Sequence, residues 1–297
     1  MLMTLARSDA ALIPDADLAS PTVTPMTDTS PLQHEIDVWW QAVNAFADVL
    51  DGLSDDEWHL ATDLPGWDVH AVAAHTAHLE HLTAGGRHED VTFERPGHVR
   101  SDMGMFTEAG VLARTDRTGA ELVDEIRTSA AKRREHLAAE PPMDPDAPAI
   151  GLFGAIGWST RTLLRNRPLD VWMHEQDVRR AVGRPGGLDS PAAAHVVDYL
   201  TESLGYVLAK RLKEAPGTSV ALQVEGHEPV TVAVRDDGRG AVTPGASDHA
   251  GAALVLDREA FILAAGGRRP VGLDAARTVE GDEELAGRLL AGMGVTP

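Results

Sequence analysis

The stretch RPLDVWMHEQDVRRAVGRP, residues 167–185, has the pattern of an amphipathic helix with polar residues on the side that should face a protein core. At 100° per residue, Asp170, His174 and Asp177 fall within one narrow arc that valines and a methionine border. Burying two carboxylates and an imidazole without partners would cost several kcal/mol. The sequence therefore predicts that something inside the fold compensates these side chains.

We expect this helix to begin at Pro168 and to end at about Val182. Proline is favoured in the first turn of a helix, and the GRPGG segment at 183–187 is a typical helix terminator. A separate short helix is expected at about 158–164. The solvent face of the main helix is predicted to carry Glu175, Gln176 and Arg179.

Three further amphipathic helices precede this stretch. Apolar residues recur at spacings of three and four over 31–50, again over 69–83, and from 118 to about 137. The connection after residue 83 is glycine-rich and poorly periodic, so we expect it to be a long loop. Four such helices favour a four-helix bundle with long second and third connections.

The helix over 69–83 has a histidine in its apolar arc. His75 lies at the centre of that arc, whereas His78 lies at its edge and His81 falls outside it. A single core histidine is usually a hydrogen-bonded structural residue, and an Asp170–His174 pair at i,i+4 could be a surface salt bridge. Because both features face the predicted core, we favour a metal site instead.

His75, Asp170 and His174 form the predicted ligand set. Two histidines and one carboxylate give a divalent ion, zinc in the first place, three protein ligands and leave a fourth position open for chemistry. Asp177 lies one turn after His174, so it is predicted either to orient that ligand or to bind substrate.

The remainder of the chain has a different pattern. A helix is expected over 191–214, followed by strands in SVALQVEG (219–226), PVTVAVRDD (229–237) and AALVLD (252–257), the first two forming a hairpin. Helices over 259–265 and 283–293 complete a small α+β domain. We therefore divide the chain into a disordered extension (1–30), a metal-binding bundle (31–186) and an α+β domain (187–297).

Composition narrows the class of function. A net charge of -20, from 46 acidic and 26 basic side chains, disfavours binding to nucleic acids and to anionic membranes. No apolar run reaches the roughly 20 residues that span a bilayer. We expect a soluble, cytoplasmic protein. The absence of cysteine excludes a cysteine nucleophile, so any thiol chemistry must use a thiol from outside the chain.

Two segments resemble signatures of the DinB-like maleylpyruvate isomerase family. In PGWDVHAVAAHTAHLE (65–80), the histidine eight residues after the tryptophan is His75. In the 167–185 stretch, a carboxylate, a histidine four residues on and an aspartate three beyond it precede a Gly-Pro turn. These residues are Asp170, His174 and Asp177.

The C-terminal segments 254–270 and 279–290 are similar to the small sterol-carrier-like domain that often follows this bundle. The resemblance thus implies an α plus α+β fold, in which a DinB-like four-helix bundle precedes a sterol-carrier-like domain. It covers nearly everything after residue 30. One departure is that many members carry Glu where this chain has Asp170, so the shorter side chain needs either the helix closer or a rearranged coordination shell.

The resemblance also implies a function. Family members use the thiol mycothiol, whose sulfur would bind the metal as a thiolate, the competent nucleophile. We expect this low-molecular-weight thiol to add to a small electrophilic substrate, giving an isomerase or an S-transferase. Three arginines of the C-terminal domain are candidates for binding anionic groups of the thiol or substrate: Arg258, Arg268 and Arg269.

The residues by themselves leave other functions open. Two histidines and a carboxylate also occur in zinc hydrolases, with water in the open position, and in non-haem iron oxygenases. A non-enzymatic alternative is a protein whose C-terminal domain binds a small ligand while the bundle metal is structural. The sequence favours no substrate and no oligomeric state.

Overall fold

The computed structural model describes residues 29–296. Most of the predicted N-terminal extension, residues 1–28, lies outside the described residues. The chain is already packed at Ser30, whose side chain is buried and donates a hydrogen bond to the carbonyl of Pro142.

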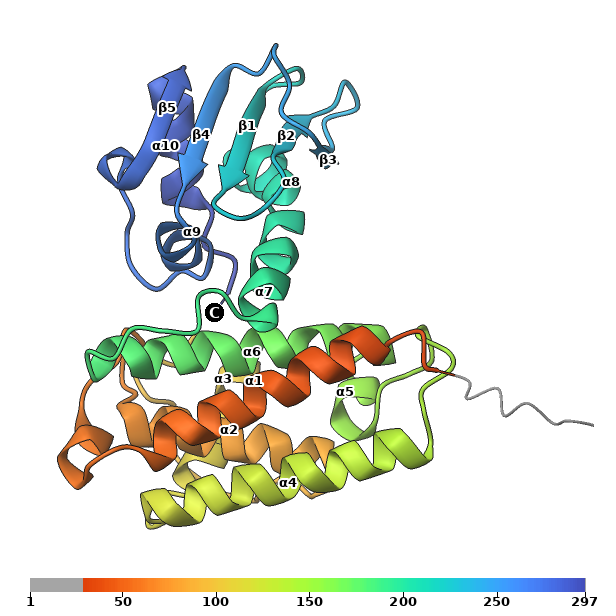
Figure 1. Cartoon of the computed structure of the whole chain (residues 1–297), viewed down its shortest axis with the longest axis vertical. Helices are drawn as coiled ribbons and strands as arrows, with labels where there is room; N and C mark the ends of the chain where they lie inside the picture. Colours follow the sequence, from red (N-terminus) through yellow and green to blue (C-terminus); the bar gives the residue numbers. More distant parts are fainter. Residues whose placement is uncertain (1–28, 297) are drawn as a thin grey trace, which may run out of the picture.

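Four long helices form the first body of the molecule, drawn at the bottom of Figure 1. They are α1 (Gln33–Asp51), α2 (Val69–Thr83), α4 (Gly119–Ala139) and α6 (Thr160–Ala181). Helix α1 packs on α6 and α4, and α2 packs on α4 and α6. Their apolar faces meet in one core that includes Trp39, Phe46 and Trp172. The predicted helical bundle is confirmed.

Helix α6 begins earlier than the sequence suggested. It is continuous from Thr160, so Pro168 lies in its interior rather than in its first turn, and most of the short helix expected at 158–164 is the first part of α6. The side chain of Ser159 caps the helix by accepting a hydrogen bond from the backbone N–H of Thr162. Burial of Leu163 and Leu164 stabilises the turns before the proline, which offsets the backbone hydrogen bond that proline cannot donate.

The predicted solvent face of α6 is wrong at two positions. Glu175 and Gln176 are only 1% and 2% exposed, because the connection after α6 folds back over that face. The side-chain amide of Gln176 donates to the carbonyl of Gly186, and the Trp172 indole donates to that of Gly187. Glu175 is paired with Arg179 at 2.7 Å.

The connection after α2 contains a helix that the sequence did not reveal. Helix α3 (Asp102–Leu112), capped by Ser101, packs against α2. It covers His78, which is fully buried rather than at the edge of the apolar face. Gly110 makes this close approach possible, since a Cβ there would lie 2.0 Å from Nδ1 of His78. Two short helical segments, η1 (Asp55–His59) and α5 (Gly151–Ala155), complete the bundle.

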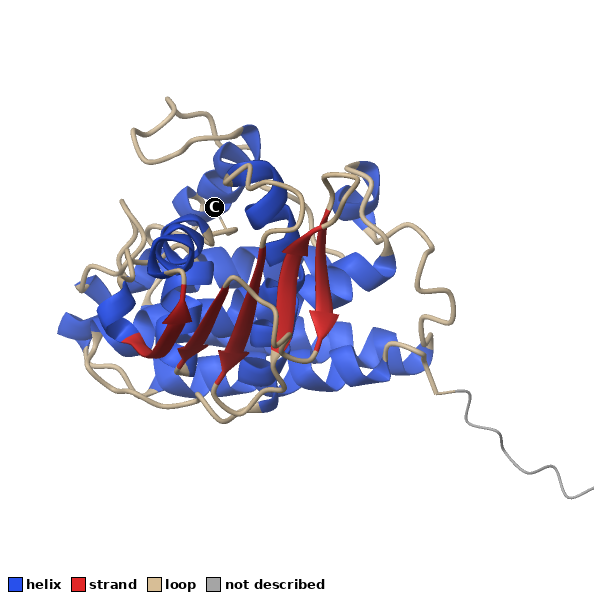
Figure 2. Ribbon diagram, turned by 90° about the horizontal axis from the view of Figure 1, so that it is seen from above, coloured by secondary structure: helices blue, strands red, loops and turns tan. Residues whose placement is uncertain are grey.

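The second body is a five-stranded sheet with helices, as predicted for a small α+β domain. Its strands are β1 (Ser219–Val224), β2 (Val230–Val234), β3 (Gly240–Pro244), β4 (Ala252–Leu256) and β5 (Ala276–Gly281). Its helical segments are α7 (Pro191–Glu202), α8 (Leu204–Tyr206), η2 (Val207–Arg211), α9 (Arg258–Ala265), η3 (Leu273–Ala275) and α10 (Glu283–Gly292). The order is β3-β2-β1-β4-β5, with β1 and β4 parallel and the other pairs antiparallel. Figure 2, which is seen from above, shows the strands side by side in front of the bundle helices. The expected hairpin is β1–β2, whereas β3 and β5 were not predicted.

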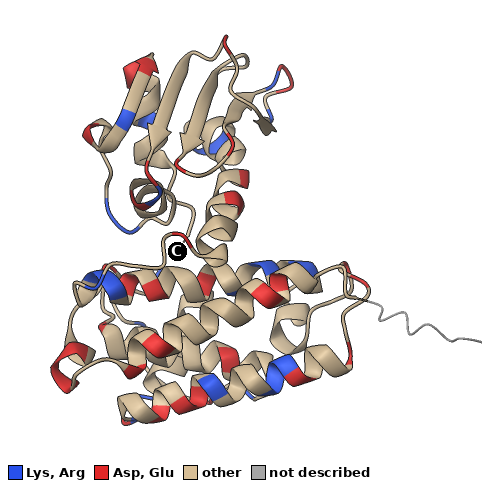
Figure 3. Cartoon of the chain, viewed as in Figure 1, with Lys and Arg blue, Asp and Glu red and all other residues tan. Residues whose placement is uncertain are grey.

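The two bodies are joined by α7, which packs on α6 and α1. A single apolar cluster runs from the bundle into the sheet domain. The predicted division near residue 186 falls in the connection between α6 and α7, and we keep it as a proposal. Acidic and basic residues are both spread over the two bodies (Figure 3). No helix among residues 29–296 is long and apolar enough to cross a membrane.

Candidate metal centre

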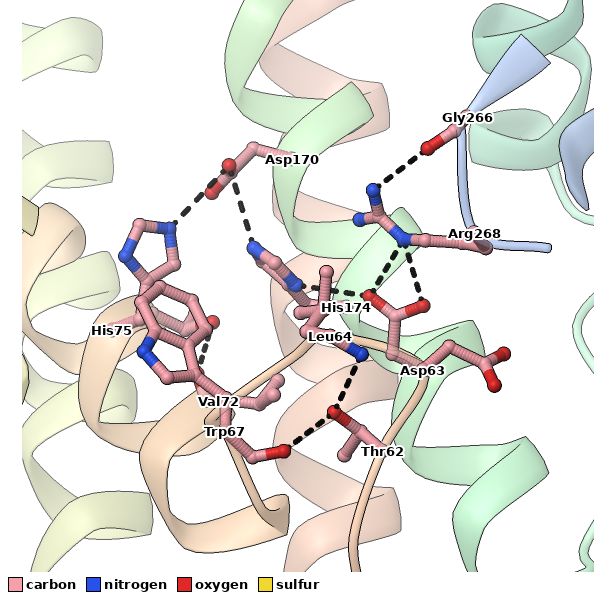
Figure 4. A network of polar contacts seen from close by, with 12 residues as sticks. Thr62, Asp63, Leu64, Trp67, Val72, His75, Asp170, His174, Gly266 and Arg268 are labelled. Carbon is pink, nitrogen blue, oxygen red and sulfur yellow. Dashed lines mark hydrogen bonds and ion pairs between the residues drawn. The ribbon is translucent and has the colours of Figure 1, made fainter. Parts of the chain in front are cut away.

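The three predicted ligands come together between α2 and α6. Nε2 of His75 lies 3.5 Å from Oδ1 of Asp170, and Nε2 of His174 lies 3.6 Å from the same oxygen. All three atoms lie within 4.8 Å of one another, and both imidazoles are buried. Figure 4 shows both rings facing the Asp170 carboxylate. Two residues that are four apart on α6 and one residue of α2 therefore direct their side chains at one point.

The separations of these atoms suit a metal ion better than hydrogen bonds. At 3.5 and 3.6 Å, the contacts are longer than the 2.7–3.2 Å of an N–H···O bond. Two ligand atoms of a tetrahedral zinc ion, each about 2.0–2.1 Å from the metal, lie about 3.3 Å apart. The aspartate arm reaches both imidazoles, so the residues present fit a divalent ion of the zinc type.

A buried arginine fixes the Asp170 carboxylate. Nη1 of Arg167 donates to Oδ2 of Asp170 at 2.9 Å, which leaves Oδ1 directed at the imidazoles. Burial raises the pKa of Asp170, but Arg167 and the two histidines outweigh it and hold that pKa well below its usual value. Asp170 is therefore an anion ready to bind a cation.

Arg167 also belongs to a second buried ion pair. Its Nη2 lies 2.8 Å from Oε1 of Glu80, a residue of α2 that is fully buried. The Trp39 indole donates to Glu80, and Arg133 lies 4.0 Å from it. Sequence reasoning missed Glu80 and Arg167, although Glu80 closes the 65–80 segment and Arg167 opens the 167–185 stretch.

Asp177 lies behind His174, on the side away from Asp170. Its Oδ2 is 3.2 Å from Nδ1 of His174, and Arg268 and Arg180 donate to its Oδ1 at 2.9 and 2.6 Å. Burial lowers the pKa of His174, but Asp170 and Asp177 raise it more, to above its ordinary value. Burial raises the pKa of Asp177, yet His174 and Arg268 bring it to about 2. Asp177 is thus an anion that contacts Nδ1 of His174.

His75 is positioned by an aromatic ring. The Trp67 ring lies 4.9 Å from the His75 ring, and its indole N–H donates to Glu108 at 2.9 Å. Within residues 29–296, Nδ1 of His75 is buried without a hydrogen-bond partner. Burial lowers the pKa of His75, so the ring is neutral at pH 7 and its Nε2 can bind a metal.

The three predicted anion-binding arginines lie in different places. Arg268 contacts Asp177 directly, and Arg269 donates to Asp63 at 2.7 Å. Arg258 instead contacts the carbonyl of Leu188 and lies 3.7 Å from Asp189. The structure therefore brings Arg268 next to the centre and Arg269 close to Arg268, but it does not bring Arg258 there.

Comparison with known proteins shows which family models and solved structures this chain resembles. The model described as "Mycothiol maleylpyruvate isomerase N-terminal domain" matches residues 39–179, and that described as "MDMPI C-terminal domain" matches residues 193–288. Two similar solved structures are a mycothiol-dependent maleylpyruvate isomerase (16% identity, TM-score 0.51) and its histidine-to-alanine mutant (17%, 0.50). Each comparison covers 84% of this chain and 93% of the other, and at this identity it shows a common fold. No curated protein matches the sequence.

Proposed function

This chain belongs to the mycothiol maleylpyruvate isomerase family of enzymes, and we propose that it is a metal-dependent enzyme that uses mycothiol as its thiol. The proposed reaction adds the thiol to an electrophilic carbon of a small substrate. Elimination after bond rotation makes the enzyme a cis-trans isomerase of the maleylpyruvate isomerase kind, whereas retention of the thiol makes it an S-transferase.

The observation that carries this proposal is the convergence of His75, Asp170 and His174 in one buried centre. Those three side chains would hold zinc or another divalent ion through two nitrogens and one oxygen, and the fourth position would stay open. When bound, such an ion supplies positive charge that lowers the pKa of a thiol at that open position.

The surrounding residues prepare this centre for an anionic ligand. Arg167 keeps Oδ2 of Asp170 occupied, and Asp177 keeps the proton of His174 on Nδ1, so that Nε2 stays available. We assign anion binding to Arg268 and to Arg269, whose side chain is 56% exposed, where the C-terminal domain meets the bundle. Arg258 lies elsewhere, beside Leu188 and Asp189, and we assign it no such role.

Thiol dependence tests the function most directly. We expect the metal-loaded protein to convert maleylpyruvate to its trans isomer with mycothiol present and to show only the uncatalysed rate without it. An S-transferase would instead consume the thiol in proportion to the substrate. Rates measured by absorbance, with thiol titrated in parallel, separate the two. Equal rates with and without mycothiol would favour a hydrolase or an oxygenase and would overturn the thiol assignment.

Asp177→Asn tests the orienting role of this carboxylate. The amide keeps the size of the side chain but removes the charge that raises the pKa of His174, so we expect metal affinity to fall by roughly 10–100-fold. Titration with zinc against a competing chelator measures this change.

Asp198→Asn is the matched control for Asp177→Asn. Asp198 also lies 3.2 Å from a histidine Nδ1, that of His227, but its side chain is 73% exposed and it belongs to α7. Its replacement should leave metal affinity unchanged. Equal affinities in both variants would show that Asp177 does not act on the ligand.

A further inference from the structure

A second cluster of potential ligands lies one helical turn from the first, on α2 and the connection that follows it. Nε2 of His78 is 3.1 Å from Nδ1 of His88 and 3.3 Å from Oε2 of Glu89. The three atoms lie within 4.8 Å of one another, as in the first centre. None of these residues takes part in the function proposed above.

A hydrogen bond between the two imidazoles does not account for this cluster. Such a bond uses one nitrogen of each ring and leaves Oε2 of Glu89 buried without a hydrogen-bond partner in the described part of the chain. An unsatisfied buried carboxylate oxygen is unfavourable, because it has lost its hydration without gaining a hydrogen bond. A cation between Glu89 and the two rings would satisfy that oxygen and both nitrogens.

The fold leaves only one ring nitrogen of His78 able to bind a cation. Gly110 of α3 lies so close to Nδ1 of the ring that a Cβ there would be 2.0 Å from it. No ligand fits on that side of the ring, so Nε2 is the nitrogen that can bind. It points at His88 and Glu89.

The other two residues are held in place as well. The His88 ring stacks on Phe106 of α3, with 4.2 Å between centroids and 24° between planes. Oε1 of Glu89 accepts from Arg114 at 2.7 Å, and Arg114 is 3% exposed and also paired with Glu125 at 2.6 Å. Since Glu125 offsets the charge of Arg114, the charge of Glu89 is left for a cation.

We propose that His78, His88 and Glu89 form a second metal site, distinct from the first, for a divalent ion of the zinc class. Two imidazoles and one carboxylate are a donor set that suits zinc, cobalt and nickel rather than magnesium or calcium. Arg114 is the outer partner that orients the glutamate, and such partners are a regular part of protein metal sites.

This second ion would hold the segment 84–101 against α2 and α3, because His88 and Glu89 belong to that segment and His78 belongs to α2. The same segment carries His98, which lies 3.1 Å from Glu108, and Glu108 accepts the indole N–H of Trp67. Trp67 packs against His75. The second site would therefore hold in place the residues that pack against His75, namely Trp67 and its partner Glu108, without contacting the ligands of the first centre.

Zinc stoichiometry of the full-length, tag-free, metal-stripped protein tests this proposal. We expect two equivalents in the parent protein and one equivalent in His88→Ala and in Glu89→Gln. His81→Ala is the matched control, because this histidine is on the same helix outside both clusters, and it should keep two equivalents. A single equivalent in the parent protein, or two in His88→Ala, would overturn the proposal.

The two sites are separated by comparing variants. His174→Ala should lose the first ion and keep the second, so zinc should still slow trypsin cleavage after Arg87 and Arg100 in that variant. The double variant His88→Ala/His174→Ala should show no such protection. Protection that persists in the double variant would contradict the second site. A lack of thiol-dependent turnover would contradict the proposed function and leave these stoichiometries as they are.

Discussion

Replacing His174 by alanine is expected to remove one bound metal ion and all thiol-dependent turnover while leaving the fold intact. The variant keeps Asp170 and His75 but loses the nitrogen that approaches the shared oxygen from the α6 side, 3.6 Å away. Loss of a ligand should cost more than the roughly 10–100-fold in affinity that loss of an outer partner costs. The open position then has no ion beside it, and turnover should fall to the uncatalysed rate.

The fold should tolerate this change. Asp177 keeps its contacts with Arg268 and Arg180, so no buried charge loses its last partner. Metal content by mass spectrometry and turnover with mycothiol should be measured together, with circular dichroism to verify folding. His81→Ala should match the parent protein in all three. Full metal content in His174→Ala would refute the assignment of this residue.

The helices that the sequence predicted are those whose apolar residues are large and regularly spaced. The run from Ile36 to Leu50 is an example, because bulky residues at helical spacing can only be buried on one face. Helix α3 was missed because its buried residues, 108–111, are consecutive and mostly small. Strands β3 and β5 were missed because they are mostly half-exposed or exposed, and pairing with their neighbours stabilises them.

The candidate site likewise has a part that the sequence predicted and a part that it did not. A helical wheel places His75, Asp170 and His174 on inward faces, and α2 and α6 are neighbours, so their convergence follows from the bundle itself. A wheel does not say which segment covers a face. The burial of His78 depends on α3, and that of Glu175 on the connection after α6, and neither packing was visible in the pattern.

Arg167→Met is expected to destabilise the protein more than the replacement of any surface charge does. Arg167 and Glu80 are 1% and 0% exposed, so the change leaves a carboxylate in the core without its nearest cation. Breaking a buried pair costs about 3–5 kcal/mol. Because Trp39 and Arg133 still approach Glu80, we expect about 3 kcal/mol, or a fall in Tm of roughly 6–12 °C.

Arg165→Met is the control that separates this effect from the loss of any arginine on α6. Its ion pair with Glu202 is shorter, at 2.6 Å, but Glu202 is 60% exposed, so the cost should stay within about 1 kcal/mol. Thermal unfolding followed by circular dichroism measures both variants. An equal fall in Tm would show that burial of the Arg167–Glu80 pair does not decide its contribution.

A double variant then shows why the loss occurs. In Glu80→Gln/Arg167→Met the core no longer contains the Glu80 carboxylate, so the double variant should regain part of the stability that Arg167→Met loses. The recovery is partial because the buried Arg133 loses its 4.0 Å contact with Glu80. Metal affinity should nevertheless stay low in both, because Oδ2 of Asp170 has lost the donor that directs Oδ1 toward the imidazoles. Stability that recovers while metal affinity does not would assign two separate roles to Arg167: neutralising Glu80 and positioning Asp170. If both recovered together, the arginine would act on the centre only through the stability of the bundle.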